Sequence, residues 1–137
     1  MTPMISIIGT DKKAKTDAVE ALVKELSSRG YKVGALKHHV HDDFEIDVPG
    51  KASYRHRKAG ACEIAVSSPT MFAFIKDNDC EMDLVDIEKY FSGGIDIIIT
   101  EGYASADTPK IEAPIADVPG VADGIVAEFL SDDKAGR

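Results

Sequence analysis

The sequence predicts a three-layer α/β domain, in which a mostly parallel sheet carries helices on both faces. Short apolar runs alternate with helical patterns along the chain, as in proteins whose parallel strands are joined by crossover helices. A strand, a helix and a second strand follow one another over residues 4–37, which favours two parallel strands in one sheet. We therefore expect a single domain spanning residues 1–137, a length that buries a sizeable core.

The first expected strand covers residues 4–9, because its apolar run is nearly continuous and suits a strand buried on both faces. Residues 9–16 follow, and their sequence GTDKKAKT matches the phosphate-binding motif G-x-x-x-x-G-K-[S/T] except at Ala14. Free N–H groups at the start of the next helix would hold phosphate oxygens, with Lys15 as an added charge and Thr16 as a Mg²⁺ ligand. This pattern predicts a P-loop NTPase-like fold; the alternative is a strand, turn and helix with surface lysines.

Periodicity and turn residues predict the other elements. Apolar residues at helical spacing between Val19 and Leu26 indicate a helix that ends near Gly30. Residues 31–37 are interpreted as the second strand, and the alternation of residues 44–48 favours a short strand or hairpin arm. The remaining expected elements are a short helix over 51–59, strands over 61–67, 70–75 and 95–100, helices over 83–91 and 118–130, and a disordered tail over 131–137.

Composition and charge argue against several classes of protein. A net charge of −8 speaks against non-specific binding to nucleic acids or to anionic membrane surfaces. No apolar run is long enough to span a bilayer and no secretory signal is visible, so we expect a cytoplasmic protein. Cys62 and Cys80 form no C-x-x-C pair and are expected to stay reduced; Cys62, among apolar neighbours, is interpreted as a small buried hydrophobe.

Polar segments follow the apolar strands at three places where a ligand site is expected. Ligands of such sheets bind beyond the carboxyl ends of the strands, and the polar segments are residues 9–16, residues 37–53 and the stretch that starts at Glu101. An acidic residue opposite a phosphate loop can hold Mg²⁺ or orient water, which makes Asp47 and Glu101 the candidate catalytic residues. The alternative for each is a solvated loop carboxylate or a helix cap.

Two further clusters contain side chains that are capable of chemistry. His38, His39 and His41 suggest a metal site, but adjacent strand side chains point to opposite faces and only His56 offers another histidine. Polar loop contacts, including contacts to phosphate, are favoured instead. The basic run over residues 55–58 indicates a solvated face, with a docking or anion patch as the alternative. The chain has no G-x-S-x-G elbow, which argues against a nucleophilic hydrolase.

Several segments together resemble a known family, the molybdopterin-guanine dinucleotide biosynthesis protein B (MobB) family. They occur in the family's order and at roughly its spacing: Lys37-His38 with His41, and residues 47–51, 57–61, 100–103 and 109–112. The resemblance implies a P-loop GTP-binding fold, usually dimeric. It also implies an accessory role beside the guanylyltransferase that turns molybdopterin into molybdopterin-guanine dinucleotide.

The resemblance implies GTP and Mg²⁺ as cofactors, with Thr16, Asp47 and Glu101 near the metal. The candidate nucleotide contacts are Gly9, Lys13, Ala14, Lys15, Thr16, Asp17, Lys37 and His38. Family members usually show Ser-Gly-Lys-Thr-Thr where this chain has residues 13–17, and Gly-Lys-Asp-Ser where it has residues 50–53. A late strand, whose following loop is expected to recognise guanine, is missing between residues 109–112 and the last helix. Nucleotide choice and hydrolysis therefore stay open.

The departures from the motif lead to an expectation about affinity. Glycine lets a phosphate loop approach the anion closely, and a left-handed conformation at Ala14 would cost about 1–2 kcal/mol. Ala14→Gly is therefore expected to tighten Mg·GTP binding roughly tenfold. Asp11 and Asp17 repel phosphate by on the order of 1–4 kcal/mol per charge at about 4 Å. Lys12 and Lys13 offset part of this repulsion, so weak binding is expected.

Three functional interpretations follow. The first is a MobB-like GTP-binding accessory protein, at most a weak Mg²⁺-dependent GTPase, which forms a homodimer and serves molybdopterin guanylyltransferase or a molybdoenzyme. The second is a non-hydrolysing dimeric adaptor with a decayed nucleotide site, serving a molybdo- or tungstoenzyme. The third is a small-molecule kinase that uses the same loop, an interpretation weakened because no lid or arginine-rich substrate segment is recognisable.

Overall fold

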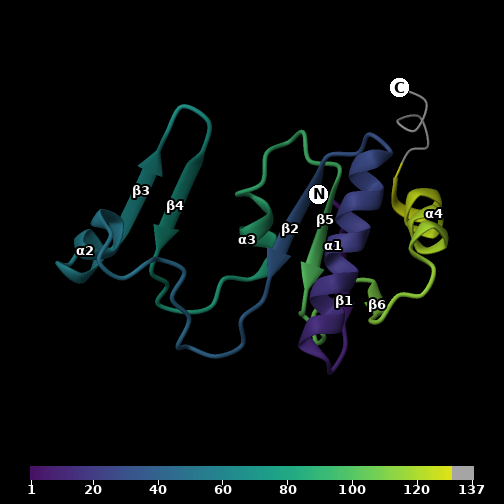
Figure 1. Cartoon of the computed structure of the whole chain (residues 1–137), viewed down its shortest axis with the longest axis horizontal. Coiled ribbons are helices and arrows are strands. Elements are labelled where there is room, and N and C mark those ends of the chain that lie inside the picture. Colours follow the sequence, from purple (N-terminus) through teal and green to yellow (C-terminus); the bar gives the residue numbers. More distant parts are fainter. Residues whose placement is uncertain (131–137) are drawn as a thin grey trace. The chain divides into compact units, whose positions relative to one another are not determined.

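The computed structural model (Figure 1) describes residues 1–130, and its contacts divide the chain into two units. The first unit contains residues 1–40 together with the chain from Val85 onward, and the second contains His41–Leu84. The interpretation of residues 1–137 as one domain stays a prediction, and the tail predicted over 131–137 lies outside the described residues.

A parallel sheet of four strands forms the centre of the first unit, in the order β2-β5-β1-β6 (Figure 1). The strands are β1 (Met4–Ile8), β2 (Val33–Lys37), β5 (Ile97–Glu101) and β6 (Lys110–Glu112). Strand β1 pairs with β5 and β6, and β2 pairs with β5, all in parallel. The predicted mostly parallel sheet is confirmed, with β5 inserted between the two strands that come first in the sequence.

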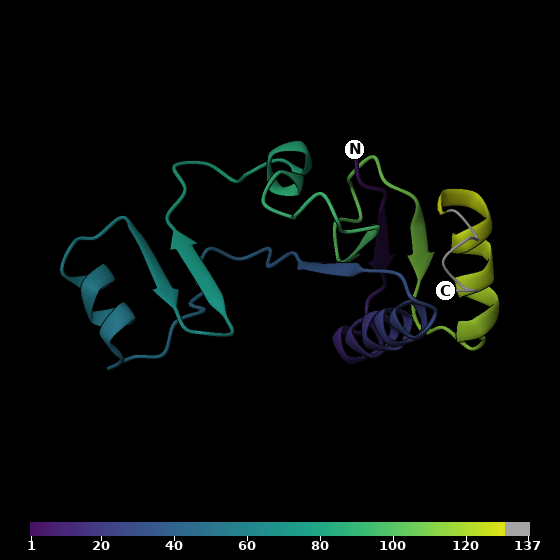
Figure 2. The same cartoon turned by 90° about the horizontal axis from the view of Figure 1, so that it is seen from above.

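Helices lie on both faces of this sheet, as predicted (Figure 2). Helix α1 (Lys12–Ser28) covers one face, and α4 (Val118–Phe129) packs against α1. Helix α3 (Leu84–Glu88) lies on the other face and is shorter than the predicted 83–91. The reason is that residues 89–91 continue as turns, in which each N–H bonds to the carbonyl three residues back.

The core of the first unit lies between the sheet and the two long helices. Residues of β1 and β5 that point to the same face are buried there against α1 and α4, because alternate residues of a strand share a face. This buried cluster contains Ile5, Ile7, Ala18, Leu22, Leu26, Tyr31, Ile97, Ile99, Ala122 and Ile125. On the opposite face the strands carry hydroxyl groups, where Thr100 donates to Ser6 at 2.9 Å and Ser6 lies 2.6 Å from Thr108.

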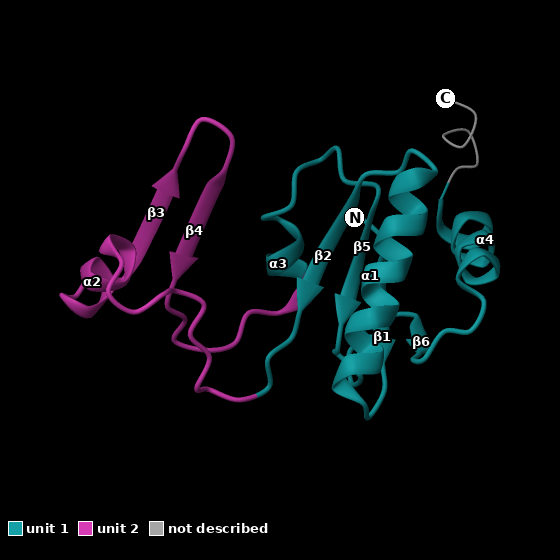
Figure 3. Cartoon of the chain, viewed as in Figure 1, with its two compact units in different colours: residues 1–40, 85–137 teal, residues 41–84 magenta. Residues whose placement is uncertain are grey.

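The second unit is a hairpin with one short helix (Figure 3). Strands β3 (Glu63–Ser67) and β4 (Phe72–Lys76) pair antiparallel, and α2 (Ala52–Lys58) contacts β3. Arg57 joins two loops of this unit, because its guanidinium lies 2.7 Å from Glu45 and 2.9 Å from Asp77. The helix and the two strands expected between 51 and 75 are therefore present, and the strands form a separate sheet.

Two sequence-based predictions about the second unit are wrong. Residues 44–48 form no strand, because local carboxylates bind the backbone N–H groups that a ladder would need. The Glu45 side chain accepts from the Asp47 N–H at 3.1 Å, and the Asp47 side chain accepts from the Val48 N–H at 2.9 Å. Cys62 is exposed rather than buried, since it precedes β3 at the end of a sheet of only two strands.

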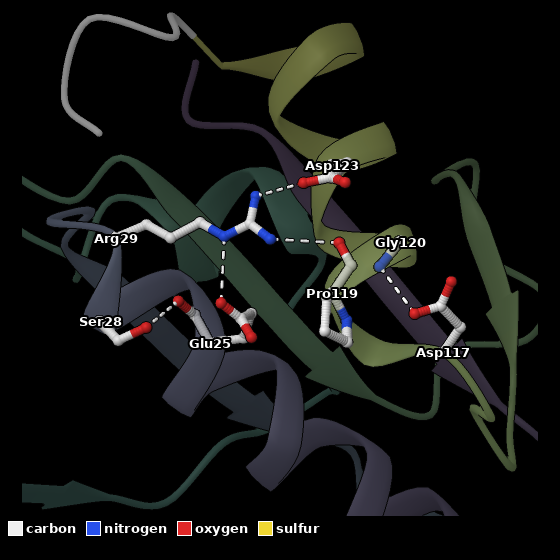
Figure 4. Close-up of polar contacts among 7 residues, drawn as sticks. All are labelled: Glu25, Ser28, Arg29, Asp117, Pro119, Gly120 and Asp123. Carbon is white, nitrogen blue, oxygen red and sulfur yellow. Dashed lines mark hydrogen bonds and ion pairs between the residues drawn. The ribbon is translucent and has the colours of Figure 1, made fainter. Parts of the chain in front are cut away.

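In the first unit, Arg29 ties the end of α1 to the start of α4 (Figure 4). Its guanidinium donates to Asp123 at 2.7 Å, to the Pro119 carbonyl at 3.1 Å and to Glu25 at 3.1 Å. Helix α4 begins nearby, where the Asp117 side chain accepts from the Gly120 N–H at 3.1 Å. This contact between the helices closes one side of the core.

Arg29→Ala is expected to lower the free energy of unfolding by about 1–2 kcal/mol, because three charge-assisted hydrogen bonds at a half-buried position are lost. Arg29→Lys keeps the charge but lacks the planar fork, so it is expected to recover only part of the loss. Urea unfolding measures both variants. Lys24→Ala, an exposed lysine of the same helix, serves as the control, and an equal effect of Arg29→Ala and Lys24→Ala would contradict the prediction.

Candidate nucleotide site

The loop between β1 and α1 consists of Gly9, Thr10 and Asp11 only, since α1 already begins at Lys12. Gly9 has a φ of 151°, which side chains with a Cβ rarely adopt. A Cβ at this position would lie 3.5 Å from Cγ of Lys15, so the lysine stem runs close beside Gly9. The glycine and the lysine of the motif are therefore neighbours in space, as the phosphate-loop interpretation requires.

Asp11 caps α1 with its own carboxylate. Its side chain accepts from the Lys13 N–H at 3.1 Å, and its carbonyl accepts the first helical hydrogen bond, from the Lys15 N–H, at 3.1 Å. Aspartate is among the preferred N-cap residues, so this start of the helix is favoured locally. A negative charge of the protein therefore already lies at the helix N-terminus where the sequence predicts phosphate.

Ala14 does not take the left-handed conformation considered from the sequence. It lies within α1, and among residues 1–130 the one residue other than glycine with a positive φ is Tyr103. The premise for a tighter Ala14→Gly variant is therefore wrong. The physical reason is that the Asp11 cap starts the helix before Ala14, and alanine is the residue that favours helix most.

Thr16, Lys37 and Glu101 come together at the carboxyl ends of the strands. Lys37 and Glu101 are register partners at the ends of β2 and β5, and their charged groups lie 2.7 Å apart. The Thr16 hydroxyl donates to the Lys12 carbonyl at 3.2 Å and also interacts with the Glu101 carboxylate. His38 adds a backbone hydrogen bond, from its N–H to the Glu101 carbonyl, at 3.0 Å.

The Glu101 carboxyl yields a prediction about pH. Burial raises its pKa, but hydrogen bonds and charges from Lys37, Thr16 and Lys15 outweigh burial, so the pKa lies below the ordinary value of 4.5. Such a carboxyl stabilises the fold above its unfolded-state pKa and loses that contribution as the pH falls through the folded-state pKa.

Wild type is therefore expected to be more stable than Glu101→Gln near neutral pH, and this difference is expected to shrink as the pH falls below the ordinary glutamate value. Urea unfolding of both proteins over this range measures it. The Glu20→Gln variant, at an exposed position of α1, controls for a general effect of charge. A stability difference that stays constant with pH would contradict the prediction.

Sequence reasoning missed an aromatic pair beside Glu101. The rings of His38 and Tyr103 stack, with centroids 4.3 Å apart and planes inclined by 14°. Gly102 makes room for this pair, because a Cβ at Gly102 would lie 3.1 Å from the His38 Cβ. The loop that follows is held by Lys110, whose ammonium donates to the carbonyls of Ala106 and Thr108. In the sequence, the one signal for this aromatic pair was the turn-forming Gly102 between Glu101 and Tyr103.

The other candidate residues lie in different surroundings. Lys13 and Asp17 form an exposed ion pair at 2.7 Å. Both line a groove of about 360 Å³, whose other side is formed by Pro114, Ile115 and Val118. Asp47 belongs to the second unit, where Ser53 donates to its Oδ1 at 2.9 Å. Its Oδ2 is buried without a hydrogen-bond partner among the described residues.

The donors in the first unit suit a hard cation such as Mg²⁺, which prefers oxygen ligands and keeps several waters. Thr16 offers a hydroxyl and Glu101 a carboxylate, and the Thr16 hydroxyl helps to lower the pKa of that carboxyl. Among residues 1–130, no group of three histidine, cysteine or acidic side chains is arranged to hold a metal ion. In the same range, no helix is long and apolar enough to cross a membrane.

A parallel sheet with a glycine-led loop after β1, and an acidic residue at the end of the neighbouring β5, defines an α/β protein with a P-loop-like fold. The family model described as Molybdopterin guanine dinucleotide synthesis protein B matches residues 4–119. The chain therefore belongs to the MobB family, and the resemblance drawn from the sequence is confirmed.

Relatives and solved structures agree with this assignment. The molybdopterin-guanine dinucleotide biosynthesis adapter protein of Escherichia coli K12 is 31% identical over 115 residues, which cover 81% of this chain and 65% of that protein. The adapter protein of Haemophilus influenzae is 27% identical over 110 residues, which cover 80% and 61%. The chain thus spans less than two thirds of the length of these two relatives.

The crystal structure of Bacillus subtilis MobB superimposes with a TM-score of 0.68 at 23% identity, over 88% of this chain and 72% of that chain. The crystal structure of a MobB homologue from Bacillus stearothermophilus gives a TM-score of 0.60 at 21% identity, over 80% and 62%. At these identities the likeness establishes the fold.

Proposed function

We propose that this protein is a cytoplasmic GTP-binding accessory protein in molybdenum cofactor biosynthesis, which acts beside the guanylyltransferase that makes molybdopterin-guanine dinucleotide. The family match over residues 4–119 carries the proposal, and the relatives named as adapter proteins of this pathway support it. At the site, Lys15 would contact the terminal phosphates, and Thr16 and Glu101 would hold Mg²⁺. The metal would supply positive charge to the phosphates.

A specific observation favours a second candidate, the non-hydrolysing adaptor with a decayed nucleotide site. The Asp11 carboxylate already accepts from the Lys13 N–H at 3.1 Å, so a phosphate would have to share the helix N-terminus with a like charge. Such repulsion is worth on the order of 1–4 kcal/mol at about 4 Å. A protein that keeps the family fold, and the surface that binds its partner, would then act without nucleotide.

Asp11→Asn separates the two candidates. Asparagine caps a helix about as well as aspartate, so the fold is expected to stay intact while the charge is lost. Calorimetric titration with Mg·GTP and Mg·ATP is expected to show roughly tenfold tighter binding in the variant at low salt, and a smaller gain at high salt because ions screen exposed charges.

The matched control is Asp117→Asn, which makes the same substitution at the cap of α4 and is expected to leave affinity unchanged. If wild type and Asp11→Asn both fail to bind either nucleotide at millimolar concentration, the first candidate falls and the adaptor without nucleotide is supported. An equal gain in nucleotide affinity in Asp11→Asn and Asp117→Asn would show that the net charge of the protein, and not the carboxylate at the start of α1, weakens binding.

We further propose that the protein is a homodimer that uses the β3–β4 hairpin. Phe72 and Phe74 share one face of β4, where their side chains are 67% and 44% exposed. Exposed aromatic side chains grouped on one sheet face are typical of interaction surfaces. The other face of the hairpin carries Ile64, which is buried.

Sedimentation is expected to show a species of twice the 14.7 kDa chain mass at tens of micromolar, and Phe74→Lys is expected to shift it to the monomer. Val85→Lys, at an apolar residue of the first unit that is also exposed, is the control and should leave the dimer intact. A wild-type protein that sediments only as a monomer would refute the proposed dimer.

A further inference from the structure

Glu101 ends a buried strand, and among residues 1–130 its carboxylate forms one ion pair. The Lys37 ammonium lies 2.7 Å from Oε2 of Glu101, and the side chains are 50% and 9% exposed, respectively. A buried carboxylate without a partner is costly, so this ion pair keeps the acid charged in the absence of a metal. The pair comes from β2 and β5, whose ends are aligned by the register of the sheet.

The two partners differ in mobility. Glu101 is held by its place in β5, with its carbonyl bonded to the His38 N–H and its carboxylate beside Thr16. Lys37 is half exposed and has a flexible four-carbon stem, so its ammonium can move into water once another cation takes its place beside the carboxylate. The lysine is therefore the partner that moves when another cation arrives.

We propose that the Lys37 ammonium occupies the cation position beside Glu101 when no metal is bound, and that a divalent cation binds there only by displacing it. A lysine charge and a metal charge beside one carboxylate repel each other. Lys37 therefore lowers the affinity of the bare protein for Mg²⁺ and restricts loading to metal that arrives with phosphate. This inference rests on the proposed role of Thr16 and Glu101 as metal ligands.

The test uses Mn²⁺ alone, without nucleotide, and reads free Mn²⁺ by electron paramagnetic resonance. Lys37→Met is expected to bind Mn²⁺ about tenfold more tightly than wild type, which corresponds to about 1.4 kcal/mol. Lys37→Arg keeps a cation at the position and is expected to bind as weakly as wild type. Lys89→Met is the matched control, because it removes a lysine from an exposed ion pair with Asp86 and should leave Mn²⁺ affinity unchanged.

A second measurement separates metal competition from a purely structural role of Lys37. Thermal unfolding of Lys37→Met is expected at a lower temperature than that of wild type, and added Mn²⁺ is expected to raise it by more than in wild type. If Lys37→Met does not fold, Lys37→Gln takes its place, because the amide can still donate to Glu101. Folded Lys37→Met or Lys37→Gln protein that binds Mn²⁺ no more tightly than wild type would overturn the proposal.

The outcomes also distinguish this inference from the proposed function. Tighter Mn²⁺ binding by Lys37→Met, in a protein that binds no GTP, would support the displacement of Lys37 and reject the nucleotide role. GTP binding by wild type, with Mn²⁺ affinity unchanged in Lys37→Met and in Lys37→Gln, would support the nucleotide role and reject the displacement.

Discussion

Glu101→Gln is expected to reduce any Mg²⁺-dependent GTP hydrolysis by about a hundredfold or more, because losing charge stabilisation through a metal costs several kcal/mol of barrier. The substitution keeps the shape of a buried side chain and removes the charge that Lys37 and Thr16 surround. Asp47→Asn, at the other acidic candidate from the sequence, is expected to act in the same direction, because an amide is a weaker ligand of Mg²⁺ than a carboxylate. Single-turnover assays over a range of Mg²⁺ concentrations measure both variants.

Glu20→Gln serves as the control, because Glu20 is exposed on α1 and is expected to keep wild-type turnover. The Mg²⁺ dependence of GTP binding gives a second readout where turnover is too slow to compare. Wild-type turnover and metal dependence in both Glu101→Gln and Asp47→Asn would show that the two acidic residues had been assigned wrongly.

Lys15→Ala is expected to weaken GTP binding by about 10–100-fold, because hydrogen bonds to charged groups are worth about 1.5–3 kcal/mol. Since wild-type binding is expected to be weak, this loss leaves no detectable binding. The Lys15 side chain runs beside Gly9, which follows β1, and the Lys15 backbone N–H makes the first hydrogen bond of α1. Calorimetry with Mg·GTP measures the loss, and Lys24→Ala, an exposed lysine of the same helix, is the control. An affinity equal to wild type would mean that phosphate does not bind at this loop.

The sequence by itself determined the parts of the fold whose pattern is local. Strands β1 and β5 are buried on both faces, so their apolar runs are nearly continuous and identify them without further information. The periodic apolar face of α1 and that of α4 identified these helices in the same way. The motif segments were enough to recognise the family, because their order and spacing are properties of the sequence itself.

The tertiary structure alone decided which distant residues meet. Lys37 and Glu101 are 64 positions apart and become partners only because β5 lies beside β2 in the sheet. The stack of His38 on Tyr103 depends on the same pairing. The sequence pattern indicated Lys37, His38 and Glu101 as candidate site residues. The strand register that brings Lys37 beside Glu101 is a non-local property, which the pattern does not contain.

Some segments are compatible with two local structures, and only the tertiary structure shows which one forms. The residues from Gly9 to Thr16 are compatible with a phosphate loop and with a helix capped by Asp11, and the structure shows the capped helix. Residues 44–48 alternate like a strand, yet their N–H groups bind neighbouring carboxylates. Cys62 has apolar neighbours in the sequence but is exposed in the structure. Burial and backbone pairing depend on what packs against a segment, which the sequence of that segment does not contain.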